Sequence, residues 1–415
     1  MNLPSFYKPS IAFGLGVAIA ALAWFTQETL ALAILWLIPL LWLCSKERVQ
    51  ATALLIGYYA VTLIDVAAVT ESFKGWSTWQ CWVLYALYVG VCALLWVLCW
   101  HRSLKVRSAL LGLVLLLTNL PPFGVFLPAN PLVSAGAWWP ATGTVGLLLT
   151  YLSWLLCAWA LQQPSARTKK WMPVLTVSTV IGFSLAWNYA VWNDPDHPSD
   201  RHLNIVAIDT HLSRYPAGKL EHYSRHDQLL NVAAKYLESA ADIVVLPEAI
   251  GGLWQPNIAW LWQDMGQRYA ERSKTLIVGF SKSDADGYSN SALIFGKDPQ
   301  KTRARANIPI GGWQPWNPSQ HQPMRLTESG LIELGTNQST HMAIPVFFCW
   351  EEWTLWPWLA SAWQQKGAPV QAISLVNHWF AKDLMLGSMQ AMSAEAYARL
   401  FGWELYRAVN QSAKI

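Results

Sequence analysis

The chain has 415 residues, of which 53% are hydrophobic, and its formal net charge is only +4. The excess Lys and Arg lie mostly in short loops between apolar stretches, and no basic stripe occurs elsewhere, which excludes a basic nucleic-acid-binding surface. The composition changes near Asp194, from long apolar stretches to the mixed, charge-bearing pattern of a soluble domain. We therefore expect a transmembrane domain over residues 1–193 and a soluble α/β domain over residues 194–415.

Seven apolar stretches in the first half are candidate membrane-spanning helices, because about 20 apolar residues suffice to cross a bilayer. They are Ile11–Phe25, Thr29–Cys44, Ala51–Thr70, Trp79–Trp100, Ser108–Leu127, Trp138–Leu161 and Trp171–Trp192. The first two are short and also fit one re-entrant hairpin. No cleavable signal is evident, so the first stretch is expected to remain as an anchor.

Positive charges fall in every second gap between these stretches. The residues concerned are Lys8, Lys46, Arg48, Arg102, Lys105, Arg107, Arg167, Lys169 and Lys170. The positive-inside rule then predicts a cytoplasmic N-terminus, and an odd number of crossings places the domain from Asp194 onward on the outer face. We expect a multi-pass protein of the bacterial inner membrane with a periplasmic soluble domain.

The second half alternates short apolar strands with amphipathic helices. The expected strands are Asn204–Ile208, Ile243–Leu246, Thr275–Phe280, Ser291–Phe295, Ile344–Phe348 and Val370–Val376. The expected helices are Ser224–Ala241, Ile258–Ser273, a helix after Cys349 that reaches Gln365, and a last helix from about Gly387 to Tyr406. A long loop is expected from Ile308 to about His341.

Tryptophans are frequent in this soluble half. They include Trp254, Trp260, Trp262, Trp313, Trp316, Trp353, Trp356 and Trp358. Because Trp prefers the water–lipid interface, the pattern predicts a domain that rests on the bilayer. The alternative is ordinary packing of these side chains in the core.

Two residues stand where an apolar strand ends. Cys349 is the only cysteine outside the apolar half, and a buried strand that stops at an unpaired thiol indicates a nucleophile, although a free Cys also packs as a small hydrophobic residue. Glu248 follows the run Ile243–Pro247, at the strand end where α/β folds gather their sites, although a helix-start acid is the plainer interpretation. A carboxylate in an apolar pocket can take the proton of a thiol, whose thiolate is the attacking form.

Several short segments together resemble the nitrilase superfamily of carbon–nitrogen hydrolases in order and rough spacing. They are Val245–Glu248, Tyr288–Leu293, Ile308–Gly311, Phe348–Glu351, Asn377–Phe380 and the closing R-A-x-N segment Arg407–Asn410. With the apolar first half, the chain resembles the membrane branch of that superfamily, the apolipoprotein N-acyltransferases and the conjugal transfer proteins of the TraB type. The resemblance implies an αββα sandwich in which a Glu, a Lys and a Cys act together on an acyl group.

The chain departs from the pattern of this family at three places. The family lysine would fall at Ala304, so the expected cation is Arg303, Arg305 or Lys301, of which an arginine holds a charge but cannot shuttle a proton. Gly312 stands where the acyltransferases carry a second acid. The sequence also stops soon after the R-A-x-N segment, which suggests a domain truncated at its C-terminus. Trp350 and Trp379, from two of the matching segments, are the expected oxyanion and substrate contacts.

We therefore expect an inner-membrane acyltransferase with a thioacyl intermediate on Cys349, in the setting of plasmid conjugal transfer. Membrane phospholipid is the expected acyl donor and an amine-bearing protein or peptide the acceptor, and no cofactor, metal or nucleic acid is expected. Three alternatives stay open. They are a carbon–nitrogen hydrolase (amidase), a catalytically silent assembly factor for conjugal transfer, and a transporter with an outer binding domain.

Overall fold

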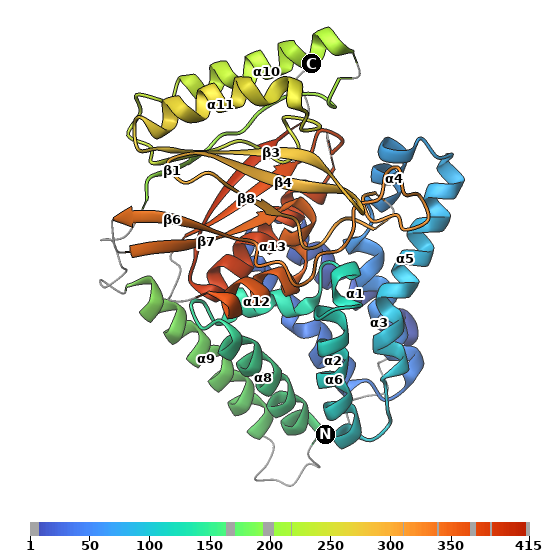
Figure 1. Ribbon diagram of the computed structural model, residues 1–415. Helices are drawn as coiled ribbons and strands as arrows, with labels where there is room; N and C mark the ends of the chain where they lie inside the picture. Colours follow the sequence, from blue (N-terminus) through green and yellow to red (C-terminus); the bar gives the residue numbers. More distant parts are fainter. Residues whose placement is uncertain are drawn as a thin grey trace. The chain divides into compact units, whose positions relative to one another are not determined.

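The computed structural model describes residues 8–162, 171–193, 203–216, 218–309, 311–337, 340–365, 371–381 and 384–411. The chain divides into two compact units (Figure 1). The first is Met1–His197 with Thr354–Trp356 and Ser388–Gly402, and the second is Pro198–Trp353, Pro357–Gly387 and Trp403–Ile415. Residues 194–202, which follow the predicted boundary, lie outside the described ranges, as do Arg167, Lys169 and Lys170.

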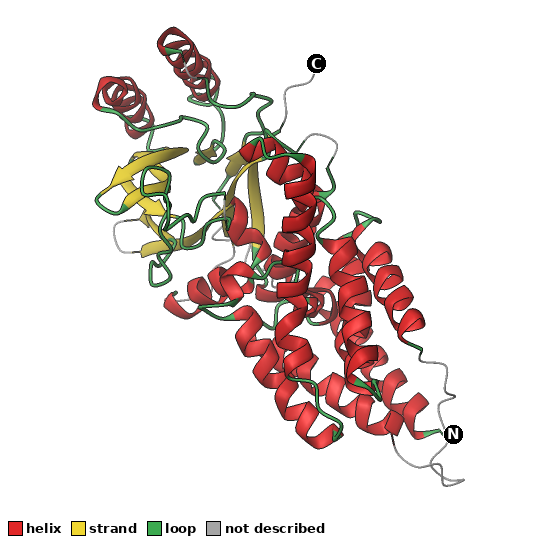
Figure 2. Cartoon of the chain, turned by 90° about the vertical axis from the view of Figure 1, so that its right-hand side faces the viewer, coloured by secondary structure: helices red, strands yellow, loops and turns green. Residues whose placement is uncertain are grey.

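The first unit consists of helices, drawn in red in Figure 2. They are α1 (Pro9–Trp24), η1 (Thr29–Trp36), α2 (Leu37–Cys44), α3 (Arg48–Thr62), α4 (Val66–Lys74), α5 (Thr78–Leu98), α6 (Leu104–Asn119), η2 (Gly124–Phe126), η3 (Pro131–Ser134), α7 (Ala135–Trp138), α8 (Thr144–Gln162) and α9 (Met172–Trp192). Each of the seven predicted stretches overlaps one or more of these helices.

Several of these helices could span a membrane. Among the described residues α5, α8 and α9 are long and apolar enough, and the pair α3 and α4, bent by 47°, gives a fourth span if it crosses as one. The predicted stretch Ser108–Leu127 is shorter as a helix, because α6 ends at Asn119 just before Pro121 and Pro122. The predicted stretch Trp138–Leu161 is likewise interrupted by Pro140 and by Gly143 at φ +56°, so α8 begins only at Thr144.

Most of α13 (Leu386–Phe401) belongs to the helical unit, although strands of the second unit flank it in sequence. Its backbone lies so close to α7 that a Cβ at Gly136 would be 1.8 Å from the carbonyl oxygen of Ala396. The predicted extension of this helix to Tyr406 is wrong. The helix ends at Phe401, since Gly402 adopts a left-handed φ of +72°, a common helix stop, and the next residues form a strand.

The second unit contains two sheets. The first joins β1 (Ile205–Ala207), β2 (Ile243–Val245), β3 (Thr275–Asp284), β4 (Gly287–Gly296) and β5 (Gln300–Arg303), in that order, with β1, β2 and β3 parallel. The second joins β6 (Leu331–Asn337), β7 (Thr340–Phe348), β8 (Gln371–Asn377) and β9 (Glu404–Asn410), with β7, β8 and β9 parallel. β6 lies in the segment that was predicted to be a loop.

Alternation along the strands sorts their side chains between two cores. Val245 and Ile277 pack with Val346 and Ile373 of the other sheet, so one core lies between the sheets. Val244 joins the second core, beneath α10 (Lys219–Ala234) and α11 (Pro256–Ala270). On the second sheet, Trp358 of α12 (Leu355–Gln364) stacks on Phe347 of β7 at 4.0 Å. The predicted order of an apolar helical region followed by an αββα sandwich is confirmed.

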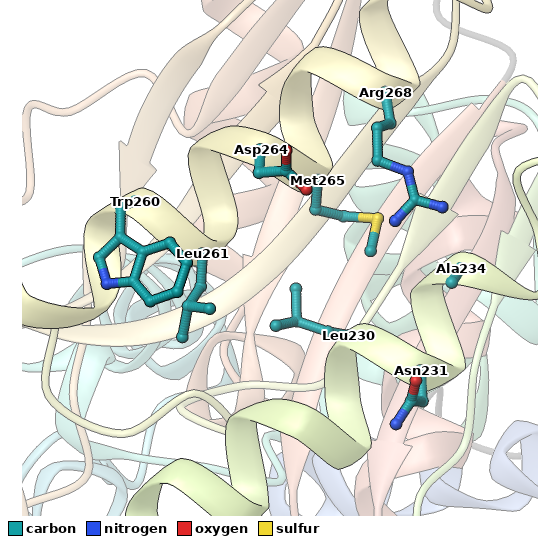
Figure 3. Close-up of a pocket in the computed structure, with 8 residues that line it drawn as sticks. All are labelled: Leu230, Asn231, Ala234, Trp260, Leu261, Asp264, Met265 and Arg268. Carbon is teal, nitrogen blue, oxygen red and sulfur yellow. The ribbon is translucent and has the colours of Figure 1, made fainter.

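A shallow hollow lies between α10 and α11 (Figure 3). It has a volume of about 150 Å³ and is lined by Leu230, Asn231, Ala234, Trp260, Leu261, Asp264, Met265 and Arg268. None of the predicted catalytic residues lines it.

The tryptophans of this unit do not form one membrane-facing surface. Trp262, Trp353 and Trp358 are buried, so for these the core-packing alternative holds. Trp260 and Trp316 are 62% and 64% exposed. A tryptophan can fill space in the core between a helix and a sheet, or it can lie exposed on the surface. The number of tryptophans in the sequence does not distinguish the two cases.

Candidate active site

Glu248 lies three residues beyond the end of β2, where the chain turns sharply. Ala249 adopts a left-handed φ of +47°. The turn presses against β3, because a Cβ on Gly279 would lie 2.3 Å from the Pro247 carbonyl oxygen and 2.6 Å from the Glu248 Cα. Only glycine allows this approach, so Gly279 fixes where the Glu248 backbone sits.

A chain of side-chain amides holds Glu248 from the second sheet. Asn377, at the end of β8, donates from Nδ2 to the Glu248 backbone carbonyl at 2.9 Å. Asn410, at the end of β9, donates from Nδ2 to Asn377 Oδ1 at 2.8 Å and accepts from the Thr210 hydroxyl at 2.8 Å. The carboxyl end of the first sheet is therefore tied to the ends of β8 and β9.

The Glu248 carboxyl group meets the Cys349 thiol. Cys349 follows β7 directly and begins the turn η6 (Cys349–Trp353), and its side chain hydrogen-bonds with Glu248. Asn290 of β4 donates from Nδ2 to Glu248 Oε1 at 2.7 Å. The structure thus brings together the two residues that the sequence singled out from opposite sheets.

The surroundings of Glu248 favour its neutral form. Burial raises the pKa of the Glu248 carboxyl from its ordinary value to about 8, and the hydrogen bond with Cys349 offsets only part of this shift. The nearby carboxylates of Glu351 and Glu352 raise the pKa further. A carboxyl with a pKa near neutrality suits proton transfer in both directions, which a general acid and base requires.

The Arg305 side chain is buried, and its guanidinium donates hydrogen bonds to protein groups. Its Nε and Nη2 donate to the Glu351 carboxylate at 3.3 and 3.1 Å, and Glu351 also accepts the backbone N–H of Arg305. Nη1 donates to the Pro357 carbonyl and the Ser361 hydroxyl at 3.0 and 2.6 Å, and Nη2 also reaches the Val346 carbonyl at 3.2 Å. Both side chains of this ion pair are fully buried. Every nitrogen of the guanidinium has a protein acceptor, so the predicted oxyanion role of Arg305 lacks a free donor.

The other two predicted cations lie on β5 and have partners elsewhere. Arg303 pairs with Asp284 at 3.5 Å and with Glu328, and Lys301 is exposed beside Lys282. None of the described contacts brings either one to Cys349. Ala304, where the family lysine was expected, packs in the core between the sheets.

Arg407 of β9 is a cation bound to the turn after β7 that the sequence analysis does not single out. It holds the buried Glu352 carboxylate with two hydrogen bonds, Nε to Oε1 at 2.6 Å and Nη2 to Oε2 at 2.8 Å. Burial lowers the pKa of Arg407, but Glu352 outweighs this, and Cys349 and Asp209 raise the pKa further, so the net shift is upward. Its signal was present in the R-A-x-N segment, which also contains Asn410.

The predicted oxyanion and substrate tryptophans lie close to these groups in sequence. Trp350 follows Cys349 and is buried, with its ring 6.0 Å from that of Trp353. Trp379 lies two residues beyond Asn377, and the Arg214 guanidinium sits 5.4 Å from its ring centre. Among the residues that the structure describes, no group of three His, Cys, Asp or Glu side chains is placed to hold a metal ion.

Comparison with known proteins finds full-length relatives. The chain is 27% identical over 424 residues to the conjugal transfer protein TraB of Agrobacterium fabrum, an alignment that covers 97% of this chain and 93% of that protein. It is 23% identical over 409 residues to the "Probable conjugal transfer protein TraB" of Sinorhizobium fredii, with 97% and 98% covered. These homologues confirm the predicted resemblance to conjugal transfer proteins of the TraB type. No protein-family model matches the chain.

Solved structures similar to this chain include amidases of the nitrilase superfamily. A variant of the amidase from Nesterenkonia is 15% identical, with a TM-score of 0.37 over 50% of this chain and 76% of the amidase. A CN-hydrolase superfamily protein from Xanthomonas campestris is 11% identical, with a TM-score of 0.30 over 42% of this chain and 64% of that protein.

Proposed function

We propose that this protein is an acyltransferase of the inner membrane that works through a thioester on Cys349 and serves conjugal transfer. The single observation that carries the proposal is the contact between the Cys349 thiol and the Glu248 carboxyl group, whose pKa is raised to about 8. A thiol next to a carboxyl group that can accept its proton is the arrangement that nucleophilic catalysis by cysteine needs.

The proposed first half-reaction acylates Cys349. Glu248 accepts the Sγ proton, the thiolate attacks the ester carbonyl carbon of a lipid, and the carbonyl electron pair moves to oxygen. When this pair returns, the bond to the leaving alcohol breaks, and the alkoxide takes the proton from Glu248. Trp350, directly after the nucleophile, is the proposed source of a backbone N–H for the oxyanion.

The second half-reaction transfers the acyl group. An amine attacks the thioester carbon and gives its proton to Glu248, and the intermediate collapses to an amide with loss of the Cys349 thiolate. Glu248 then returns the proton to sulfur. The acyl donor is proposed to be a membrane phospholipid and the acceptor an amine-bearing protein or peptide.

The proposed location follows from the charge of the loops and the helices of the first unit. Several apolar helices could span a membrane, and the alternation of positive loops favours a cytoplasmic N-terminus with the sandwich on the periplasmic side. A sandwich next to the bilayer would have phospholipid within reach as the acyl donor.

The experiment is a search for the thioester. Full-length protein isolated from membranes is digested, and the peptide containing Cys349 is examined by mass spectrometry before and after neutral hydroxylamine, which cleaves thioesters. We expect a fatty-acyl mass on Cys349 that hydroxylamine removes. Glu248→Gln should lack this mass although it is nearly isosteric, whereas Cys157→Ser, a matched change of a cysteine in the helical unit, should keep it.

The result also separates the proposal from its main competitor. If Cys349 of the wild type never carries an acyl group, and Cys349→Ala supports conjugal transfer as well as the wild type does, a catalytically silent assembly factor replaces the enzyme. The buried Ala304 at the expected position of the family lysine is the observation that favours this second candidate.

A further inference from the structure

Two buried glutamates, Glu351 and Glu352, follow Cys349, and each pairs with an arginine. The two pairs differ in how many of the guanidinium nitrogens have protein acceptors. Glu351 and Arg305 form the first pair, in which all three guanidinium nitrogens donate to protein acceptors. Glu352 and Arg407 form the second pair, in which Nε and Nη2 bind the carboxylate. Among the contacts of the described residues, Nη1 of Arg407 has no acceptor, and the side chain is 20% exposed.

The second pair, Glu352 and Arg407, is attached to the turn that begins at the proposed nucleophile Cys349. Glu352 lies in the same short turn as Cys349, three residues later. Arg407 is paired with Ser374 on the neighbouring strand β8, and Asn410, three residues further along β9, anchors the amide chain to Glu248. After Glu352, the charge of Cys349 is among the causes that raise the pKa of Arg407.

We propose that Arg407 is the fixed positive charge that stabilises the Cys349 thiolate, the charge that the family resemblance assigns to a lysine. Glu352 fixes the guanidinium along one edge and leaves the Nη1 edge available. The lysine position cannot supply this charge here, because Ala304 packs between the sheets. The inference rests on the proposed nucleophile and does not depend on which acyl group is transferred.

The other charges around the thiol leave room for this effect. Glu351 faces Arg305, Glu352 faces Arg407, and Asp209 interacts with Arg407. Glu248, whose pKa is about 8, is mostly neutral below that pH. An opposite charge within a few ångströms lowers the pKa of an acid by about 1–3 units. Because Glu352 screens Arg407, we expect the lower end of that range.

The first test measures the rate at which iodoacetamide alkylates Cys349 between pH 6 and about 10. The parent protein is the full-length chain with Glu248→Gln, which removes the carboxyl group whose titration is coupled to that of the thiol. Arg407→Gln should move the midpoint of the rate upward by about one pH unit and slow alkylation about tenfold near neutral pH. Arg407→Lys keeps the charge but not the two-pronged contact, so its rate should stay within about twofold of the Glu248→Gln parent. Arg303→Gln, the matched control on β5, should not change the profile.

A purely structural Arg407 would give the opposite pattern. In that case Arg407→Lys would change the alkylation profile of Cys349 as much as Arg407→Gln does, or Arg407→Gln would leave the midpoint of the profile unchanged. Either result overturns the proposal. Loss of the acyl mass in the thioester experiment would not bear on it, since alkylation needs no acyl donor.

A second measurement needs no variant and covers the case in which Arg407→Gln fails to fold. The rate with anionic iodoacetate is divided by the rate with neutral iodoacetamide, for Cys349 in the wild type and for free cysteine. A net positive field at the sulfur should make the ratio for Cys349 higher than that for free cysteine. A lower ratio would mean that the carboxylates dominate and would overturn the proposal.

Discussion

Glu248 is held by contacts that leave its carboxyl group free to change protonation. Asn377 binds the backbone carbonyl, Asn290 binds one carboxyl oxygen, and the Cys349 thiol contacts the same group. Glu351 and Glu352, by contrast, are each held by a guanidinium. The contacts therefore leave Glu248 available for proton transfer, whereas Glu351 and Glu352 hold the turn after β7 in place.

The raised pKa of Glu248 predicts how stability depends on pH. The folded protein binds this proton up to about pH 8, whereas an unfolded Glu releases it near its ordinary value of 4.5. The stabilising contribution is thus fully present below about pH 4.5 and is lost as the pH rises to about 8. Glu248→Gln has no such proton, so its melting temperature in detergent should gain on that of the wild type between pH 5 and 8 and then run parallel to it. If the melting temperatures of the variant and the wild type differ by the same amount at every pH in this range, the raised pKa is contradicted.

The sequence exposed part of this site because strand ends are visible in it. Glu248 and Cys349 each follow an apolar run, and that pattern was sufficient to select them. Such a pattern does not select Arg407, because its proposed role depends on β9 lying two strands from β7, a long-range arrangement that no local pattern contains. The burial of Arg305 is hidden for the same reason, since its acceptors come from Val346, Pro357 and Ser361, far along the chain.

At the scale of elements, the site depends on the close contact between the turn after β2 and the strand β3. Gly279→Ala would place a Cβ 2.3 Å from the Pro247 carbonyl oxygen, a backbone atom that cannot move without displacing Glu248. We expect this variant to lose acylation of Cys349 and about 1–3 kcal/mol of unfolding free energy. Gly335→Ala on β6 is the control, because its Cβ would make only an ordinary 3.6 Å contact with Asp298. Equal behaviour of the two variants in melting and labelling would show that the turn tolerates a shift.

The strands that differ from the prediction are those whose local sequence does not clearly favour a strand. The first three residues of β9, Glu404–Tyr406, fall within the predicted last helix, whereas the helix stops at Gly402 through its backbone conformation. β6 carries a glycine and a register shift near its end, which weakens a strand pattern. The buried strands β2, β7 and β8 had no such ambiguity.

A helix from the second half of the chain links the packing of the helical unit to the strands of the site. α13 follows β8 and precedes β9, the strands that end in Asn377 and Asn410, yet most of it packs in the helical unit. The Gly143 N–H donates to the Leu400 carbonyl, and the Ala141 N–H donates to the Arg399 carbonyl at 2.7 Å. The helical unit is thus incomplete without a segment of the C-terminal half.

This arrangement predicts that a small change in α7 disturbs α13. Gly136→Ala would put a Cβ 1.8 Å from the Ala396 carbonyl oxygen, whereas a Cβ at Gly182 of α9 would meet nothing within 4 Å. We expect Gly136→Ala to lower the melting temperature in detergent and Gly182→Ala to leave it unchanged, since overpacking against backbone typically costs about 1–3 kcal/mol. The prediction is wrong if both variants melt with the wild type.

At the scale of the whole molecule, the proposed topology implies a parity condition across the membrane. The charge pattern predicts that the segment near Arg107 lies inside and the segment before α7 outside, and α6 would then have to cross between them. With 16 residues, α6 is about 24 Å long, shorter than the roughly 30 Å hydrocarbon core, so the crossing requires local thinning or contributions from flanking residues. If α6 does not cross, every later segment changes sides.

Reporter fusions decide this point. A reporter enzyme active only in the cytoplasm should work when fused after Arg107 and fail when fused after Asn130 or Asp200. Activity after Asn130 would show that α6 does not cross. Activity after Asp200 would place the Glu248–Cys349 site in the cytoplasm, and the acyl acceptor would then have to be a cytoplasmic amine. A second reporter active only outside the cytoplasm should give the reverse pattern, which guards against fusions that are simply degraded.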